Sequence, residues 1–432
     1  MQPWSAFSKR PRWSDHLTKL PSGETAAGRH AELRLSLLQA SIYAIIGVQL
    51  PFFSIWLSAR GLDAFEIAAV LAVQPVIRIG SMLLASRRAD QHGDHGALLV
   101  GCMAAVAAAY AVMGLSSGFF ALLVAGAMVA LAQGPLAPLA DGVTFGEARR
   151  RREAGLPQLH YSWVRGWGSM SILVFLAASG PVAGALAVED IVWLLTAVGA
   201  FACLACMGSL IGFGSSGARE ERRSVGRIAR PELVALVIVA AALVQSSHSM
   251  VNTFGALHWK EQGHSDTFVS FAWVAALATE VIAFLMAARW FGGESKAGAF
   301  LLVGAIGAVL RWLLMSADPG PYGIFFAQAL HGASCAAVQI GPAYLLAELG
   351  GKERLAQSQA WLAAAIAGGN SLLTFLSGPL YAQAGERAYL AMAAVAFLGL
   401  LLSFAVAHLC AGRHARTEAA RNAHAEPEHS RA

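Results

Sequence analysis

Apolar runs of about twenty residues recur along almost the whole of this 432-residue chain, separated by short polar breaks. A run of that length crosses a hydrocarbon core of roughly 30 Å when it is helical. Hydrophobic residues make up 56% of the sequence and charged residues only 13%. In an average soluble domain, roughly 45–50% of the residues are apolar and about 25% are charged. A soluble fold cannot bury so much apolar surface, so the expected solvent is the lipid bilayer.

These runs predict an all-α membrane protein with twelve transmembrane helices. Only helices pair every backbone N–H and C=O group inside a span of this length. The expected spans are residues 34–57, 65–86, 97–115, 119–141, 162–180, 190–212, 232–258, 267–289, 298–316, 321–347, 357–382 and 388–410.

Basic residues lie in alternate loops. One set of loops carries Arg87, Arg88, Arg149 to Arg152, Arg219, Arg222, Arg223, Arg227, Arg230, Arg289, Lys296, Lys352 and Arg354. The other set carries only Arg60, Lys260 and Arg387. The positive-inside rule then predicts that both termini are cytoplasmic. The net charge of +5 is a topology signal on this interpretation and indicates no nucleic-acid partner.

Residues 1–30 are polar and basic without an apolar core, so we expect no signal peptide and a bacterial-type inner membrane location. The five cysteines all lie in apolar spans, where a disulfide framework or a zinc site would lack polar support. We therefore expect no metal and no cofactor.

A polar stretch from Gly214 to Arg230 divides the spans six and six. The two halves match at an offset of 203 residues, as when Trp56 and Asp63 recur as Trp259 and Asp266. Repeated halves around a midplane site are typical of secondary transporters. The expected segments are an N-terminal segment 1–33, a bundle 34–212, a linker 213–231, a bundle 232–410 and a tail 411–432.

Few ionisable residues lie at membrane depth, where a charge costs roughly 2.5–3.5 kcal/mol and defaults to a functional role. They are Arg78, Asp141, Arg165, Glu280, Arg311 and His331. Glu280, Arg311 and His331 fall near the middle of their spans, so we expect one mutually satisfied cluster. It is either a proton relay or a structural ion pair. Arg78 has no obvious partner, and its role in function or in packing stays open.

Two polar stripes accompany these charges. Gln245, His248, Asn252 and Trp259 share a helix face, and so do Gln328, His331 and Gln339. Both faces are expected to point to the interior, where they either bind a small solute or hold helices together by hydrogen bonds.

The segment Pro138-Leu-Ala-Asp141, followed by Tyr161-Ser-Trp-Val-Arg165-Gly-Trp-Gly168-Ser, resembles the helix 4 to helix 5 signature of the phenylpropionate permease group. This group of the major facilitator superfamily is related to lactose–proton symporters. The resemblance continues through Ala278-Thr-Glu280, Arg311-Trp312, Leu330-His331-Gly332 and Ala367-Gly368-Gly369. It implies a fold of two pseudo-symmetric six-helix bundles.

The resemblance also implies roles for individual residues. Asp141 and Arg165 match positions that bind substrate in the lactose-type relatives, while Glu280, Arg311 and His331 match positions that serve proton coupling. Ser334 stands where those relatives have a further carboxylate, so either Glu280 or Asp141 would have to carry the proton, or coupling works differently. Gln339 replaces a second histidine of the phenylpropionate group, which leaves the substrate open.

The prediction is therefore a secondary transporter that takes up a small organic solute, such as an aromatic acid, with protons. The substrate residues would be Asp141, Arg165, Gln245, His248, Asn252, Trp259, Gln328 and Gln339. A drug or metabolite exporter and a sugar or nucleoside symporter stay as alternatives. No catalytic cluster such as HExxH occurs, so we expect no enzyme. The expected partners are the solute, protons and lipid, with no obligate protein partner.

Overall fold

A computed structural model describes residues 26–156, 158–211, 213, 230–290, 297–350 and 354–425 of the chain. Those residues are almost entirely helical. The predicted linker falls largely outside the described residues, together with its arginines at 219, 222, 223 and 227, and so do most of the N-terminal segment and the end of the tail.

The first half of the chain contains seven α-helices among its described residues. They are α2 (Ala26–Ala59), α3 (Ala64–His92), α4 (His95–Leu115), α5 (Phe119–Gln133), α6 (Leu136–Glu153), α7 (Tyr161–Ala183) and α8 (Ile191–Leu210), with a 3-10 turn η2 (Val188–Asp190).

In the second half, two of the spans are built from short helices joined by π-helical turns. The order is α9 (Pro231–Ser246), η3 (Val251–Gly255), α10 (Ala256–Glu261), α11 (Asp266–Trp290), α12 (Ala297–Ser316), α13 (Pro321–Ala329), η5 (Gly332–Ala336), α14 (Ala337–Gly350), α15 (Leu355–Ala384), η6 (Gly385–Ala388) and α16 (Tyr389–Ala425).

Eleven helical segments of the described chain are long and apolar enough to cross a membrane. The last of them, Gln357–Cys410, contains both α15 and α16, which are separated by the turn at Gly385. Gly385 has a positive φ of 53°, a conformation that glycine adopts without a steric penalty. A helix therefore stands at each of the twelve predicted spans.

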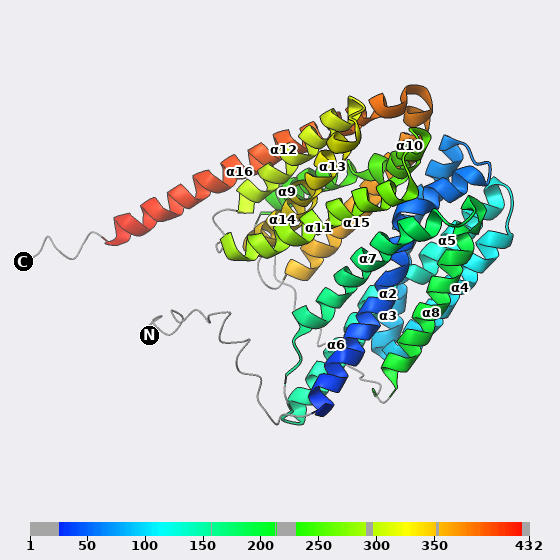
Figure 1. The fold of residues 1–432 in the computed structure, drawn as a ribbon. Coiled ribbons are helices and arrows are strands. Elements are labelled where there is room, and N and C mark those ends of the chain that lie inside the picture. The colour runs from blue at the N-terminus through cyan, green and yellow to red at the C-terminus, as the bar shows by residue number, and fades with distance from the viewer. Residues whose placement is uncertain are drawn as a thin grey trace, which may run out of the picture.

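Helices α2 to α8 pack with one another, and so do helices α9 to α16. The two groups join mainly where α3 packs on α15 and α7 packs on α11. Figure 1 shows that the groups meet at one end and diverge toward the end where Ala26 and Ala425 lie. We call the first the junction end and the second the terminal end.

Glycines permit the close approach at the junction end. A Cβ added to Gly378 of α15 would lie 2.8 Å from the carbonyl oxygen of Ala64 at the start of α3. At Gly180 of α7, an added Cβ would lie 2.7 Å from the carbonyl oxygen of Asp266 at the start of α11. Real Cβ atoms do not come so close to backbone, so these two positions hold the bundles together by having no side chain.

Three of the spans are interrupted near mid-depth. Gly134 and Pro135 separate α5 from α6, while η3 and η5 insert π-helical turns into the seventh and tenth spans. Such turns leave backbone groups away from regular helical pairing and often mark functional positions. In membranes they are tolerated only where protein or a cavity surrounds them. The three interruptions therefore indicate that a functional site lies at this depth.

We predict that Gly378→Ala destabilises the junction. Its new methyl group meets backbone of α3, and overpacking of this kind costs about 1–3 kcal/mol. Gly368→Ala in the same helix is the matched control, because nothing lies within 4 Å of an added Cβ there. Thermal unfolding in detergent should show a lower midpoint for Gly378→Ala only. Equal midpoints for the two variants would contradict the glycine contact.

Candidate functional site

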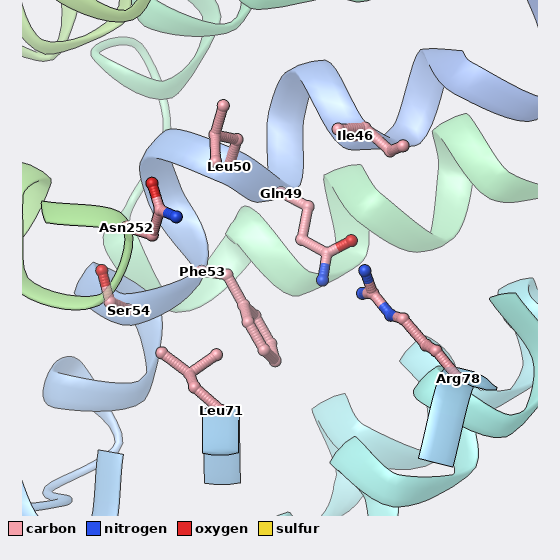
Figure 2. Close-up of a pocket in the computed structure, with 8 residues that line it drawn as sticks. All are labelled: Ile46, Gln49, Leu50, Phe53, Ser54, Leu71, Arg78 and Asn252. Atoms are coloured by element: carbon pink, nitrogen blue, oxygen red, sulfur yellow. The ribbon is translucent and has the colours of Figure 1, made fainter. Parts of the chain in front are cut away.

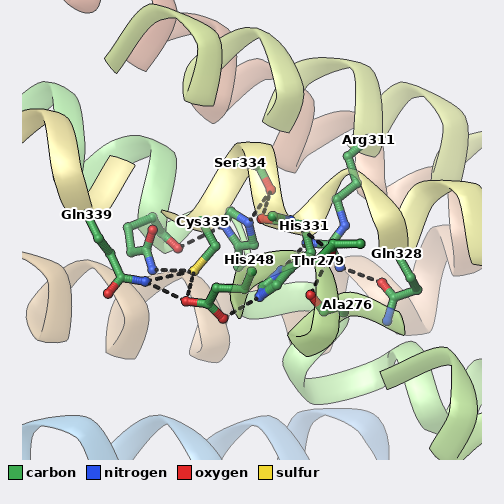
Figure 3. A network of polar contacts seen from close by, with 12 residues as sticks. His248, Ala276, Thr279, Arg311, Gln328, His331, Ser334, Cys335 and Gln339 are labelled. Carbon is green, nitrogen blue, oxygen red and sulfur yellow. Dashed lines mark hydrogen bonds and ion pairs between the residues drawn. The ribbon is translucent and has the colours of Figure 1, made fainter. Parts of the chain in front are cut away.

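Three of the predicted membrane-depth residues form a continuous line in the second bundle. A guanidinium nitrogen of Arg311 lies 2.8 Å from Nδ1 of His331, and Nε2 of His331 lies 3.4 Å from a carboxylate oxygen of Glu280. Figure 3 shows His331 within the polar network that joins Arg311 to the residues around Cys335. The expected cluster of Glu280, Arg311 and His331 is thus brought together by three different helices.

A glycine contact allows these helices to meet. Gly332 follows His331 directly, and a Cβ there would clash with the carbonyl oxygen of Thr279, the neighbour of Glu280. Instead, the Gly332 N–H donates to the Thr279 hydroxyl at 3.2 Å. The absence of a side chain at Gly332 therefore lets His331 reach the carboxylate of Glu280.

The line of contacts determines which nitrogen of His331 carries the proton. A guanidinium has only donors, so Nδ1 must accept from Arg311 through its lone pair. His331 is then neutral, with its proton on Nε2 toward Glu280. One ionised carboxylate and one guanidinium stand at the two ends of a neutral imidazole, and the three groups together carry no net charge.

Other predicted residues support this line from within the bundle. Gln328 is fully buried and accepts a hydrogen bond from Arg311. His248 is also buried, and its Nε2 lies 3.1 Å from the hydroxyl of Ser334. Both side chains make hydrogen bonds with other protein groups in the interior of the bundle. In the structure, these two predicted substrate residues lie in the protein interior next to Arg311 and His331.

Gln339 and Gln245 surround the other end of the line. Gln339 is exposed and donates to Glu280 at 2.8 Å, while both glutamines direct an amide nitrogen at the Sγ of Cys335. Sequence reasoning did not identify Cys335, whose apolar flanks gave no signal.

Glu280, His331 and Cys335 are also the group of potential metal ligands in the described part of the chain, with ligand atoms within 4.8 Å of one another. The two amide nitrogens that point at the sulfur oppose a cation there. The guanidinium of Arg311 on the other side of His331 adds to this repulsion. The arrangement suits hydrogen bonding and proton transfer better than metal binding.

Asp141 and Arg165 lie in the first bundle. A carboxylate oxygen of Asp141 accepts hydrogen bonds from Gln39 at 3.0 Å and from the Tyr161 hydroxyl at 3.2 Å. The Arg165 guanidinium lies over the ring of Tyr43, 4.5 Å from its centre. Tyr161 stands one helical turn before Arg165, so the two charges are close neighbours. The described residues include no ion pair between them in this conformation.

Gly168 explains part of the motif around Arg165. A Cβ there would lie 2.7 Å from the ring of Tyr43 and 2.9 Å from the Arg165 guanidinium. The missing side chain leaves room for the half-buried cation to stack on Tyr43, and a cation–π contact at a partly exposed site stabilises by about 1 kcal/mol.

A cavity of about 160 Å³ lies between the two bundles, and Arg78 and Asn252 both line it. Figure 2 shows the two side chains on different sides of the Phe53 ring. Asn252, predicted from the stripe in the seventh span, is exposed to this space. Arg78 was noted for its depth but not included among the predicted site residues, because no partner could be recognised from the sequence.

Trp259 requires a correction. The sequence places it on the same face as Asn252, yet its side chain is fully buried and packs against Trp273, with ring centres 6.3 Å apart. Its counterpart in the repeat, Trp56, is equally buried. The π-helical turn η3 contains Asn252 and ends at Gly255, before Trp259, and it disturbs the regular 100° rotation per residue on which the shared face was predicted. Trp259 is a core residue in this structure.

Comparison with known proteins identifies the family. Residues 33–391 match the MFS_1 like family. The chain belongs to this family of the major facilitator superfamily. It is 28% identical over 375 residues to the probable 3-phenylpropionic acid transporter of Escherichia coli strain K12, covering 84% of this chain and 95% of that protein.

Solved structures agree on the fold of this major facilitator protein. The nucleoside transporter NupG superposes with a TM-score of 0.73 at 15% identity, over 87% of this chain and 98% of NupG. A bacterial homologue of the human lysosomal transporter Spinster gives 0.67 at 12% identity, over 89% and 98% of the two chains. The family match and the Escherichia coli relative make the protein a multi-pass membrane transporter for a small molecule and not an enzyme, as predicted.

We predict that Glu280 and Arg311 of this transporter are energetically coupled through His331. Arg311→Met should lower stability by about 3 kcal/mol, because it leaves the partly buried carboxylate of Glu280 without its counter-charge. The double variant Glu280→Gln with Arg311→Met should recover at least about 1 kcal/mol of the summed losses. Thermal unfolding of the single and double variants measures this. Strictly additive losses would show that the residues act independently.

Proposed function

We propose that this protein takes up a small organic anion together with a proton by alternating access. An aromatic acid is the substrate class we favour, because the 28% identical relative from Escherichia coli is named a probable 3-phenylpropionic acid transporter. The observation that carries the proposal is the continuous line of polar contacts from the buried Arg311 through His331 to the partly buried Glu280.

Glu280 is our candidate for the group that takes up the proton. One of its oxygens faces the N–H of His331, and the other accepts from Gln339, which is exposed. A proton that reaches Glu280 removes the negative end of the line, so His331 and Arg311 lose the charge that balances them. Such a change of charge between packed helices favours their rearrangement.

The balance of charges supports an anionic substrate. Arg78, Arg165 and Arg311 oppose only Asp141 and Glu280 when His331 is neutral, which leaves one unbalanced positive charge at membrane depth. A bound monocarboxylate neutralises that charge. A proton on Glu280 then restores it, so the protein loaded with both solute and proton carries the same net charge at membrane depth as the empty protein, and neither form has an extra buried charge to move across the bilayer.

The distribution of arginines supports an orientation with both termini in the cytoplasm of a bacterial-type cell. Arg87, Arg88 and Arg354 lie at helix ends next to the terminal end, whereas Arg60 and Arg387 lie at the junction end. In this orientation the bundles touch on the outer side of the inner membrane and diverge toward the cytoplasm. The structure would then correspond to an inward-facing state.

Glu280→Gln should abolish accumulation of labelled 3-phenylpropionate driven by a pH gradient in proteoliposomes. It should keep exchange of labelled for unlabelled solute, since the amide mimics the protonated carboxyl group. Arg165→Ala should weaken both activities, because it removes a substrate contact. Glu386→Gln, in the turn between α15 and α16, is the control. Unchanged gradient-driven accumulation in both test variants would exclude these residues from the mechanism.

Transport of one monocarboxylate with one proton moves no net charge. We therefore expect a pH gradient, alkaline inside, to drive accumulation in proteoliposomes. A potassium diffusion potential of either sign, imposed with valinomycin at equal pH, should drive none. Accumulation driven by the potential alone would contradict the one-to-one stoichiometry.

A further inference from the structure

The cavity between the bundles has an apolar middle and polar ends. Ile46, Leu50, Phe53 and Leu71 contribute its apolar wall, and Arg78 and Asn252 lie toward its two sides. Its volume of about 160 Å³ compares with about 150 Å³ for an apolar protein cavity that holds benzene. The space therefore suits a single aromatic ring or an aliphatic body of similar size.

Arg78 is a cation whose hydrogen-bond partners among the described residues are all neutral. Its guanidinium donates to the side-chain oxygens of Gln133 at 2.6 Å and Gln74 at 3.3 Å. Gln133 in turn directs its amide nitrogen to Gln49 at 3.0 Å and to the Tyr110 hydroxyl at 3.3 Å. Tyr110 and Gln49 thereby orient the Gln133 oxygen toward Arg78, but no member of the group supplies a negative charge.

The guanidinium also has unused hydrogen-bonding capacity. The Nε–H of Arg78 is buried and has no acceptor among the described residues. The Nε–H of Arg311 also lacks an acceptor, but Arg311 is linked through His331 to a carboxylate. Arg165 shares its surroundings with Asp141, since both charges act on Tyr161. Arg78 differs from both, because its hydrogen-bond partners among the described residues include no acid. A guanidinium with a free N–H in a low-dielectric site is matched best by a carboxylate, which can accept two parallel hydrogen bonds.

The backbone at Arg78 is held in place by the interrupted fourth span. A Cβ on Gly134 would clash with the carbonyl oxygen of Arg78 and with the hydroxyl of Ser81, so α3 and the α5–α6 break are in close contact there. Gln133, which orients the guanidinium, immediately precedes Gly134. The break in the helix therefore fixes both the position and the direction of the cation.

We infer that Arg78 binds the carboxylate of the transported solute, with the apolar body of the solute over Phe53 and its far end at Asn252. The inference rests on the proposed function, whose substrate class it makes specific. Asn252 belongs to η3 of the second bundle, whereas Arg78 and Phe53 belong to the first. A solute in this position contacts both bundles and can therefore favour one relative arrangement over another.

The test compares an acid with its neutral counterpart. Binding of 3-phenylpropionate and of 3-phenylpropan-1-ol to the detergent-purified full chain is measured by isothermal titration calorimetry. Loss of a charge-assisted hydrogen bond corresponds to roughly a 10- to 150-fold weaker affinity. Arg78→Gln should weaken binding of the acid by this factor and leave binding of the alcohol unchanged. Arg387→Gln, at an exposed turn, removes the same charge elsewhere and should change neither affinity.

Two further variants keep the inference testable if Arg78→Gln does not fold. Arg78→Lys keeps the charge but not the two parallel donors, so it should weaken binding of the acid about tenfold or less. Asn252→Ala should weaken both compounds equally, because Asn252 is assigned to the far end of the solute. If Arg78→Gln folds and binds the acid with unchanged affinity, the inference is overturned. It is also overturned if the two single variants Arg78→Lys and Asn252→Ala both bind the acid as tightly as the unsubstituted protein.

Failure of the inference can be told apart from failure of the proposed function. The calorimetric binding experiment needs no pH gradient. If the acid binds in a manner that depends on Arg78 but a pH gradient drives no uptake, proton coupling is refuted and Arg78 remains the anion site. Equal affinity of the unsubstituted protein for acid and alcohol, or no affinity for the acid, would overturn the role of Arg78. Gradient-driven uptake of another solute would then still support the transport proposal.

Discussion

The structure depends on one constraint: an ionised side chain at membrane depth must find its counter-charge inside the protein or in a ligand. Arg311 finds Glu280 through a neutral His331, and Asp141 is held by Gln39 and Tyr161 beside Arg165. Arg78 has only amide partners. Arg78, which has no carboxylate partner among the described residues, therefore lies at the cavity between the bundles, where a transported solute would pass.

Glycines determine how closely these charges approach one another. Gly332 brings His331 to Glu280, Gly168 makes room for Arg165 over Tyr43, and Gly134 brings the break in the fourth span against Arg78. Helix association in lipid has no hydrophobic driving force, so close backbone contact through small residues contributes much of the packing. The same property serves the junction end, where Gly180 and Gly378 join the bundles.

The two kinds of comparison answer different questions. NupG and the Spinster homologue share the fold at 15% and 12% identity, which leaves the substrate undetermined. The Escherichia coli relative at 28% identity covers nearly its whole length and suggests an aromatic acid. The chemistry of the cavity, with an apolar wall and one unpaired guanidinium, agrees with that suggestion from an independent direction.

The sequence alone determined the membrane class, the twelve spans and the charges at mid-depth, because hydropathy and desolvation act on each residue wherever its neighbours lie. Glu280, Arg311 and His331 could be predicted as one cluster since each needed a partner. Only the tertiary structure decided that Trp259 is a core residue, that His248 and Gln328 lie behind the cluster, and that Arg78 faces the cavity. Helical periodicity shows which residues share a face, but π-helical turns change that face, and neighbouring helices decide whether it meets protein or solute.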